Sequence, residues 1–136
     1  MPAYNEANYI GSVVLQAKPY ADEVIVADDG SKDRTAEIAA LAGASVIKHE
    51  RNQGKGAAIQ SILVEAIKRN ADVLVIMDAD AQHDPGEIPP LIKAVSEGAD
   101  LVIGSRSLGR ENIPTYRKLG QKVLSSLTGT LSKAKV

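Results

Sequence analysis

The stretch Val73-Leu74-Val75-Ile76-Met77-Asp78-Ala79-Asp80-Ala81-Gln82-His83-Asp84-Pro85 decides the fold, because an apolar run ends there in two carboxylates separated by one residue. Residues 73–77 include no polar side chain, which predicts a strand buried on both faces of a parallel sheet. Ligands of open α/β sheets bind just beyond the carboxyl ends of such strands. Asp78 and Asp80 are therefore predicted to lie in a binding site.

Two neighbouring carboxylates favour a bound cation. At a separation of about 4 Å they repel each other by roughly 4 kcal/mol at an effective dielectric constant near 20, so a cation helps to keep both ionised at neutral pH. Hard oxygen ligands favour Mg²⁺ or Mn²⁺ holding a phosphate. The alternative is a solvated loop whose acids begin the next helix.

Length and composition predict a single α/β domain over residues 1–136. The chain is 44% hydrophobic but only 3% aromatic, without Phe or Trp, which favours a core of Val, Ile, Leu and Ala around a helix-covered parallel sheet. The net charge of −1 gives no electrostatic reason to bind nucleic acid. The absence of cysteine excludes disulfides and agrees with a reducing compartment. No apolar run approaches about 18 residues, so we expect no membrane-spanning segment.

Helices and strands alternate along the chain. Strands are predicted at residues 23–27, 44–47, 73–77 and 101–104, and helices at about 9–20, 31–42, 57–70, 89–97 and 116–131. Residues 1–8 show a helix-start pattern with no strand in front. The alternation predicts a mostly parallel sheet with right-handed crossovers and helices on both faces.

Three further segments carry polar side chains at predicted strand or helix ends. Asp28 to Asp33 is either a ligand loop or an ordinary strand-to-helix turn, since Asp, Gly and Ser also turn and cap well. Asn52 to Gly56 leads into a helix and could receive phosphate oxygens, although its spacing is not that of a Walker A loop. Arg106 could bind phosphate in bidentate fashion or be a surface cation. His83 could be a ligand or a base, but a lone His in such a loop more often supports it by hydrogen bonding.

Five motifs in this order resemble those of family 2 glycosyltransferases, most closely the polyprenyl-phosphate branch related to dolichyl-phosphate mannose synthase. They are Pro2-Ala3-Tyr4-Asn5-Glu6, Asp28-Asp29-Gly30-Ser31-Lys32-Asp33-Arg34-Thr35, Asn52-Gln53-Gly54-Lys55-Gly56-Ala57-Ala58, Asp78-Ala79-Asp80-Ala81-Gln82-His83 and Gly104-Ser105-Arg106. The resemblance implies a GT-A fold, a Rossmann-like domain that binds a nucleotide-diphosphate-sugar. It also implies metal-dependent transfer with inversion at the anomeric carbon.

The resemblance assigns roles to individual positions. The residues implied to bind the nucleotide-sugar are Pro2, Tyr4, Glu6, Asp28, Gly54, Lys55 and Asp78. Asp80 and Gln82 are the implied ligands of Mg²⁺ or Mn²⁺. Asp78, Asp80 and Arg106 are the implied catalytic residues. Arg106 and, less closely matched, Arg117 are implied to engage the acceptor phosphate.

The charge changes of the reaction favour a polyprenyl or dolichyl phosphate acceptor. The leaving nucleoside diphosphate gains negative charge, which a divalent ion and Arg106 would stabilise. A lipid phosphate is already anionic and needs no general base, and none is evident. Residues 106–136 hold seven Lys or Arg and one acid, which favours peripheral contact with an anionic membrane at its cytosolic face. The alternatives are a saccharide or protein hydroxyl acceptor, or donor binding without turnover.

The sequence also departs from the family pattern at both ends. Family members carry an apolar first strand before the position of Pro2, and they continue beyond Val136 to a Ser-Gly-Phe-Arg-like acceptor segment. We therefore expect a chain truncated at both ends, with the first strand missing and low stability. Self-association through the resulting gap would compensate, because unpaired strand edges readily accept another chain.

Overall fold

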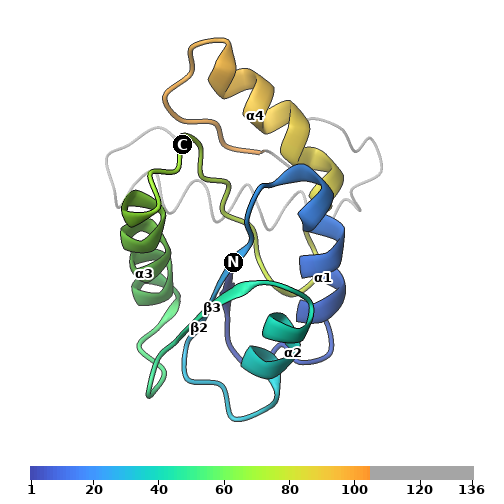
Figure 1. Cartoon of the computed structure of the whole chain (residues 1–136), viewed down its shortest axis with the longest axis vertical. Helices are drawn as coiled ribbons and strands as arrows, with labels where there is room; N and C mark the ends of the chain where they lie inside the picture. The colour runs from blue at the N-terminus through green and yellow to red at the C-terminus, as the bar shows by residue number, and fades with distance from the viewer. Residues whose placement is uncertain (105–136) are drawn as a thin grey trace, which may run out of the picture. The chain divides into compact units, whose positions relative to one another are not determined.

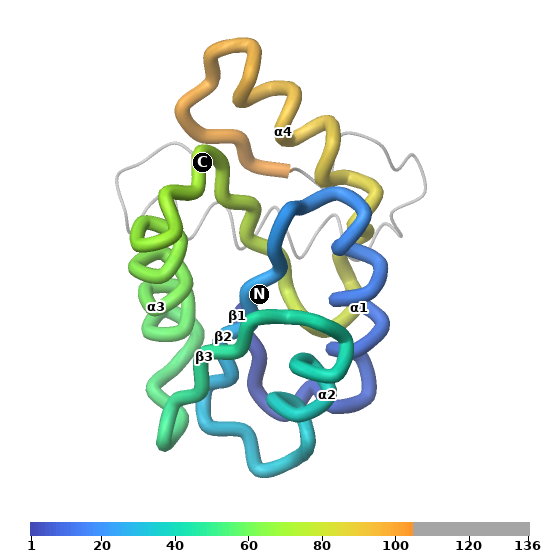
Figure 2. Tube along the Cα trace, in the orientation of Figure 1, coloured from blue at the N-terminus to red at the C-terminus, as the bar shows by residue number. Residues whose placement is uncertain are grey.

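A computed structural model describes residues 1–104, which contain a three-stranded parallel sheet and its helices (Figure 1; Figure 2). The strands are β1 (Pro2–Ala3), β2 (Ile25–Asp28) and β3 (Ser45–Lys48), in the spatial order β1-β2-β3. Pro2 lies opposite Ala27, and Val26 lies opposite Val46. The helices are α1 (Ile10–Ala17), α2 (Thr35–Leu41), α3 (Lys55–Lys68) and α4 (Ile88–Ser96), with 3-10 helices η1 (Lys18–Tyr20) and η2 (Pro85–Glu87).

Helices cover both faces of the sheet, as predicted. Successive residues of a strand point to opposite faces, and β2 and the residue before it follow this alternation. Val24 and Val26 pack with α1 and α2, whereas Ala27 packs with Ala58 and Ile62 of α3. In Figure 1, α3 lies on one side of the strands and α1 and α2 on the other. The aliphatic core predicted from composition is confirmed.

The helices lie close to their predicted positions. The first helix ends in η1, where Pro19 has no backbone N–H to donate. The third begins at Lys55, two residues before the predicted start. None of the helices within residues 1–104 is both long and apolar enough to span a bilayer. The helix predicted for residues 116–131 lies outside the described residues.

Residues 1–3 correct one expectation, because a strand does precede the first helix. The Met1 amine donates to the Ile25 carbonyl at 2.6 Å, and Ala27 N donates to the Met1 carbonyl at 2.9 Å. Asp29 N donates to the Ala3 carbonyl at 2.8 Å. This ladder makes β1 a member of the sheet and places the following residues, from Tyr4 on, at its carboxyl edge.

The buried strand predicted for residues 73–77 is wrong. These residues form no strand, and Val73 and Ile76 are 40% and 43% exposed. In a parallel ladder, alternate residues bond to opposite neighbours. Because Met1 and Ala3 bond to β2, the backbone groups of residue 2 point to the other edge of β1, where a further strand would have to pair. Pro2 has no N–H to donate at that edge. The segment is held instead by side chains, with Met77 buried in the same cluster as Met1 and Ala3.

The strand predicted for residues 101–104 is also wrong. Leu101 and Ile103 are 78% and 80% exposed, and neither belongs to a strand. A strand needs a neighbour that supplies backbone partners. Residues 73–77 form no strand that could supply such partners.

Candidate functional site

The loops that follow the three strands meet the acidic segment at one edge of the sheet. They surround a cavity of about 330 Å³. Its lining residues are Pro2, Ala3, Tyr4, Glu6, Asp29, Asn52, Lys55, Ala58, Asp78, Ala79 and Asp80. Residues from four separate parts of the sequence thus converge where a parallel sheet is expected to bind its ligand.

The structure brings together most of the site residues predicted within the first 104 positions. Six of them line this cavity: Pro2, Tyr4, Glu6, Lys55, Asp78 and Asp80. Three do not line it: Asp28, Gly54 and Gln82. Arg106 and Arg117 lie outside the described residues, so their roles remain predictions.

An ion pair crosses the cavity. Lys55 is the first residue of α3, and its Nζ donates to Asp78 Oδ1 at 2.6 Å. The Lys55 side chain is 61% exposed. Exposed ion pairs contribute only about 0.2–1 kcal/mol to stability, because water and salt screen them. Lys55 can therefore exchange Asp78 for an anionic ligand at little cost.

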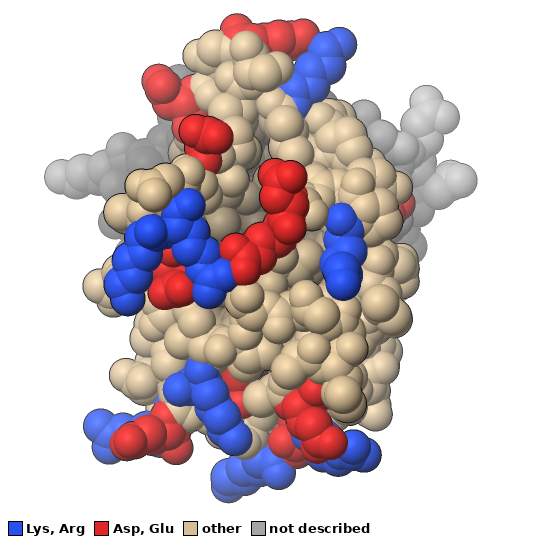
Figure 3. Space-filling model, viewed as in Figure 1, with Lys and Arg blue, Asp and Glu red and all other residues tan. Residues whose placement is uncertain are grey.

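Neighbouring acids raise the proton affinity of Glu6 in the cavity wall. Burial raises the pKa of Glu6, and the negative charges of Asp80, Asp33 and Asp78 raise it further. This concentration of acids is local, since Figure 3 shows basic and acidic side chains interspersed over the viewed face. A cation bound between the acids would relieve their repulsion.

The donor atoms fit a metal ion that is shared with a ligand. Among residues 1–104 no three metal-ligating side chains come together as a ready-made cage. Mg²⁺ is usually held by one or two carboxylates together with substrate phosphates and water. Asp78 and Asp80 offer such carboxylates beside the cavity. The site therefore suits an ion that arrives with a phosphate-bearing molecule.

The acidic loop is closed by its own hydrogen bonds. Gln82 N donates to Asp80 Oδ1 at 3.0 Å, and Asp78 N donates to His83 Nδ1 at 3.0 Å, which confirms His83 as a support of this loop. Ala81 between them has a φ of 60°, a conformation that non-glycine residues rarely adopt. Gln82 is exposed, and its role as a metal ligand stays a prediction.

The two acids at the end of β2 have different environments. Asp28 is 1% exposed; its Oδ1 accepts from Ser31 N at 3.2 Å, while its Oδ2 has no hydrogen-bond partner among the described residues. Its neighbour Asp29 lines the cavity instead. Adjacent residues of an extended chain point in opposite directions, which explains why Asp29 and not Asp28 lines the cavity.

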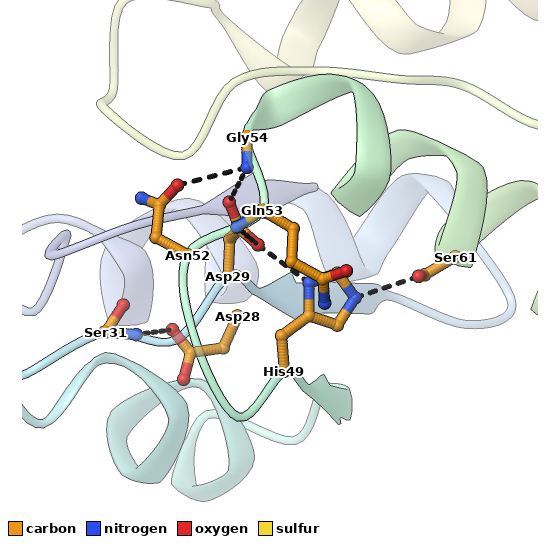
Figure 4. A network of polar contacts seen from close by, with 8 residues as sticks. All are labelled: Asp28, Asp29, Ser31, His49, Asn52, Gln53, Gly54 and Ser61. Carbon is orange, nitrogen blue, oxygen red and sulfur yellow. Dashed lines mark hydrogen bonds and ion pairs between the residues drawn. The ribbon is translucent and has the colours of Figure 1, made fainter.

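A polar network that the sequence patterns did not predict ties Asp29 to the rest of the site (Figure 4). Asp29 Oδ1 lies 2.7 Å from His49 Nδ1 and accepts from Gln53 N at 2.9 Å. Asp29 Oδ2 accepts from Gly54 N at 2.7 Å. Burial alone would raise the pKa of Asp29, but the bonds from His49, Gln53 and Gly54 outweigh it and lower that pKa. A lone His after a strand gave no signal of this role.

Comparisons with known proteins identify the family. A family model described as "Glycosyl transferase family 2" matches residues 1–134. The dolichol-phosphate mannosyltransferase of Pyrococcus furiosus is 38% identical over 135 residues, covering 90% of this chain and 37% of the relative. The UDP-N-acetylglucosamine–dolichyl-phosphate N-acetylglucosaminyltransferase of Methanococcus voltae is 36% identical over 151 residues, covering 94% and 60%.

Solved structures give the same result. Glucosyl-3-phosphoglycerate synthase from Mycobacterium tuberculosis in complex with UDP superposes with a TM-score of 0.69 at 26% identity, covering 97% of this chain and 48% of that one. Its complex with Mn²⁺ and UDP-glucose gives a TM-score of 0.62 at 32% identity, covering 71% and 38%.

The chain therefore belongs to glycosyl transferase family 2, and its α/β fold is the GT-A fold. Both predictions drawn from the five motifs are confirmed. The chain spans 37–60% of the length of three curated relatives whose names include dolichol or dolichyl phosphate, from Pyrococcus furiosus, Methanococcus voltae and Haloferax volcanii.

Proposed function

We propose that this chain is the donor-binding domain of a glycosyltransferase. It transfers a sugar from a nucleotide-diphosphate-sugar, of the GDP-mannose or UDP-glucose type, to a polyprenyl or dolichyl phosphate, with inversion. The observation that carries the proposal is the cavity in which Glu6, Lys55, Asp78 and Asp80 meet beyond the carboxyl ends of the strands. Relatives named for dolichyl and undecaprenyl phosphate support the acceptor class.

The charge of the cavity supports a role for Mg²⁺ or Mn²⁺. Among the lining residues that the structure describes, Glu6, Asp78 and Asp80 outnumber the cation Lys55, so a diphosphate would meet a net negative wall there. Asp78 and Asp80 would hold a divalent ion, with Gln82 as a further ligand. When bound, the ion supplies positive charge to the leaving diphosphate. The neighbouring structure with Mn²⁺ and UDP-glucose supports this part of the proposal.

The other residues of the site bind and orient the two substrates and stabilise the developing charge. Lys55 leaves Asp78 and binds a phosphate oxygen, while Asp78 orients the nucleotide-sugar. Pro2 and Tyr4 form the wall beside the base and ribose, with Asp28 behind them as a predicted contributor. Arg106 stabilises the charge that develops on the diphosphate. Arg106 and Arg117 hold the acceptor phosphate, whose own charge removes the need for a general base.

We place this reaction at the cytosolic face of a membrane, which the domain contacts peripherally. The excess of Lys and Arg in residues 106–136 supports attraction to anionic lipid headgroups. Sedimentation with vesicles containing phosphatidylserine should carry the chain down at low salt, and neutral vesicles should not. Equal recovery with both kinds of vesicle would contradict the membrane contact.

Self-association is the last element of the proposal. A second cavity, of about 470 Å³, is lined by Met1 and by many aliphatic side chains, among them Val24, Ile62, Val75 and Ile92. Apolar side chains of a second copy would fill it and bury further apolar surface. Light scattering should then give a mass that rises with concentration. A monomer mass at all concentrations would contradict this element.

Donor binding can be tested by thermal unfolding with Mn²⁺ and either UDP-glucose or GDP-mannose. A ligand at 100 times its dissociation constant stabilises a fold by about 2.7 kcal/mol, so the midpoint should rise with one of the two. Asp80→Asn removes the charge at nearly constant shape and should abolish the rise. No rise with either nucleotide-sugar would overturn the proposed function. Binding without sugar transfer to a polyprenyl phosphate would overturn the acceptor assignment alone.

A further inference from the structure

The polar network behind the cavity joins three separate segments through one carboxylate. Asp29 follows β2, His49 follows β3, and Gln53 and Gly54 precede α3. The side chains of Asp29 and His49 are both largely buried. Asp29 bonds to all three partners, at distances between 2.7 and 2.9 Å. Because hydrogen bonds to ionised groups are the stronger kind, Asp29 fixes the loop that leads to Lys55.

His49 contacts the same oxygen of Asp29 that accepts from Gln53 N. Its Nδ1 lies 2.7 Å from Asp29 Oδ1, and its Nε2 lies 2.9 Å from Ser61 Oγ on α3 (Figure 4). An ionised carboxylate can only accept, so Nδ1 carries a proton, and in the neutral ring Nε2 then accepts from the Ser61 hydroxyl. Both ring nitrogens are thus committed, which fixes the orientation of the ring.

This order of Ser, His and Asp has the contacts of a nucleophilic triad, but its surroundings do not suit one. Neither His49 nor Ser61 lines either of the two cavities described above. Ser61 lies within α3, between Lys55 and Lys68, where the backbone N–H groups are used by the helix itself. Within residues 1–104, the backbone of α3 therefore offers no oxyanion site beside this hydroxyl. The contacts instead connect α3 to the sheet.

Backbone packing gives the loop a second fixed point. Gly30 has a φ of +71°, and a Cβ placed on it would lie 2.5 Å from the carbonyl carbon of Arg51. The loop backbone therefore rests directly on the turn after β2. This contact and the bonds to Asp29 hold the loop at two points. The loop places Asn52 in the cavity wall and Lys55 beside Asp78.

We propose that His49 and Ser61 are positioning residues of the donor site. Through Asp29 they hold the Asn52–Lys55 loop where Asn52 and Lys55 can meet the diphosphate of the nucleotide-sugar. Neither residue touches the ligand. This inference rests on the proposed function for the identity of the ligand, whereas the placement of the loop can be tested without any ligand.

Loop placement is tested by amide hydrogen exchange on the free chain. The amides of Gln53 and Gly54 should be protected, and His49→Gln should raise their exchange rates by about tenfold or more, because its amide nitrogen cannot occupy the place of Nδ1. His49→Asn puts a donor close to the place of Nδ1 and should restore protection. Unchanged exchange in His49→Gln would overturn the inference, whether or not the chain binds a nucleotide.

Donor affinity is measured by titration calorimetry with UDP and GDP in the presence of Mn²⁺. For whichever nucleotide binds, His49→Gln should weaken binding about tenfold and Ser61→Ala about threefold. His49→Asn keeps a donor for Asp29 but loses the contact with Ser61, so its effect should match that of Ser61→Ala. Val14→Ala, a core change on the opposite face of the sheet, controls for a general loss of stability and should leave the affinity unchanged.

A double-mutant cycle separates positioning from a merely structural role. If His49 acts by placing Lys55, then His49→Gln should have little effect on affinity once Lys55→Met has removed the ammonium group. Additive effects of the two changes would overturn the positioning of Lys55 by His49 while leaving the proposed function intact. Absence of binding of both nucleotides by the unaltered chain would overturn the proposed function instead.

Discussion

The two walls of the cavity are built differently. The wall formed by the loops after β2 and β3 is anchored, since Asp29 is buried and its carboxylate accepts from two loop amides. The wall formed by residues 73–83 belongs to no strand, exposes Val73 and Ile76, and reaches the first wall through the screened Lys55–Asp78 pair. One wall is therefore a fixed template, and the other can adjust to a ligand.

The largest expected effect is a pH dependence of stability, which tests whether residues 73–77 pack against Met1 at the start of the sheet. Burial lowers the pKa of the Met1 amine from 8.0 to about 5, with Asp78 opposing the shift. The unfolded chain binds this proton more tightly, so stability is full above pH 8 and is lost as the pH falls toward 5. A shift of this size corresponds to about 4 kcal/mol. Urea unfolding at several pH values measures it.

Acetylation of the Met1 amine is the matched control for this pH dependence. The acetylated chain keeps every other titrating group, so the difference between the two stability profiles isolates the amine. If residues 73–77 swing away in solution, water reaches the amine and the two profiles coincide. Coincident profiles would contradict the packing of this wall against Met1 described here.

The next largest effect concerns the anchored wall. Gly30→Ala adds a methyl group that meets the Arg51 backbone and also strains a positive φ, so we expect a loss of about 3 kcal/mol in the free energy of unfolding. Gly98→Ala is the matched control, because Gly98 has a φ of +107° with open space around it and reports the backbone strain alone. Equal losses in both variants would show that the loop does not rest on Gly30.

A smaller effect is expected where the two walls meet. Lys55→Met keeps the length of the side chain but removes the ion pair with Asp78. Stability should change by less than about 1 kcal/mol, because the pair is exposed. Affinity for the donor nucleotide should fall about tenfold, since the ammonium group contacts the phosphate in the proposed complex. A stability loss above 2 kcal/mol would mean that the pair supports the fold.

The smallest effect belongs to the adjustable wall. Ala81 has a φ of 60°, which glycine adopts without strain. Ala81→Gly should stabilise the chain by about 0.5 kcal/mol, because relief of strain slightly exceeds the entropy that glycine loses on folding. Thermal unfolding at pH 7 would detect the rise. A clear loss of stability would show that Ala81 does not hold this conformation in solution.

Local patterns predicted the helices, two of the strands and most of the cavity. Apolar spacing located the four helices, and the acids at the ends of apolar runs located Asp78 and Asp80. The strand at residues 73–77 could not be judged from its own composition, because sheet membership depends on backbone donors in β1, where Pro2 has none. Asp29 and His49 were missed because their role is mutual and arises only when β2 and β3 lie side by side.

The commitment of both His49 nitrogens also provides a spectroscopic signal. A proton held between Nδ1 and a buried carboxylate exchanges slowly with water and resonates far downfield of ordinary amide protons. The nitrogen shifts of the ring would report the same single tautomer. One nuclear magnetic resonance signal would thus show, in a mixture and without any substrate, what fraction of the molecules has the fixed wall assembled.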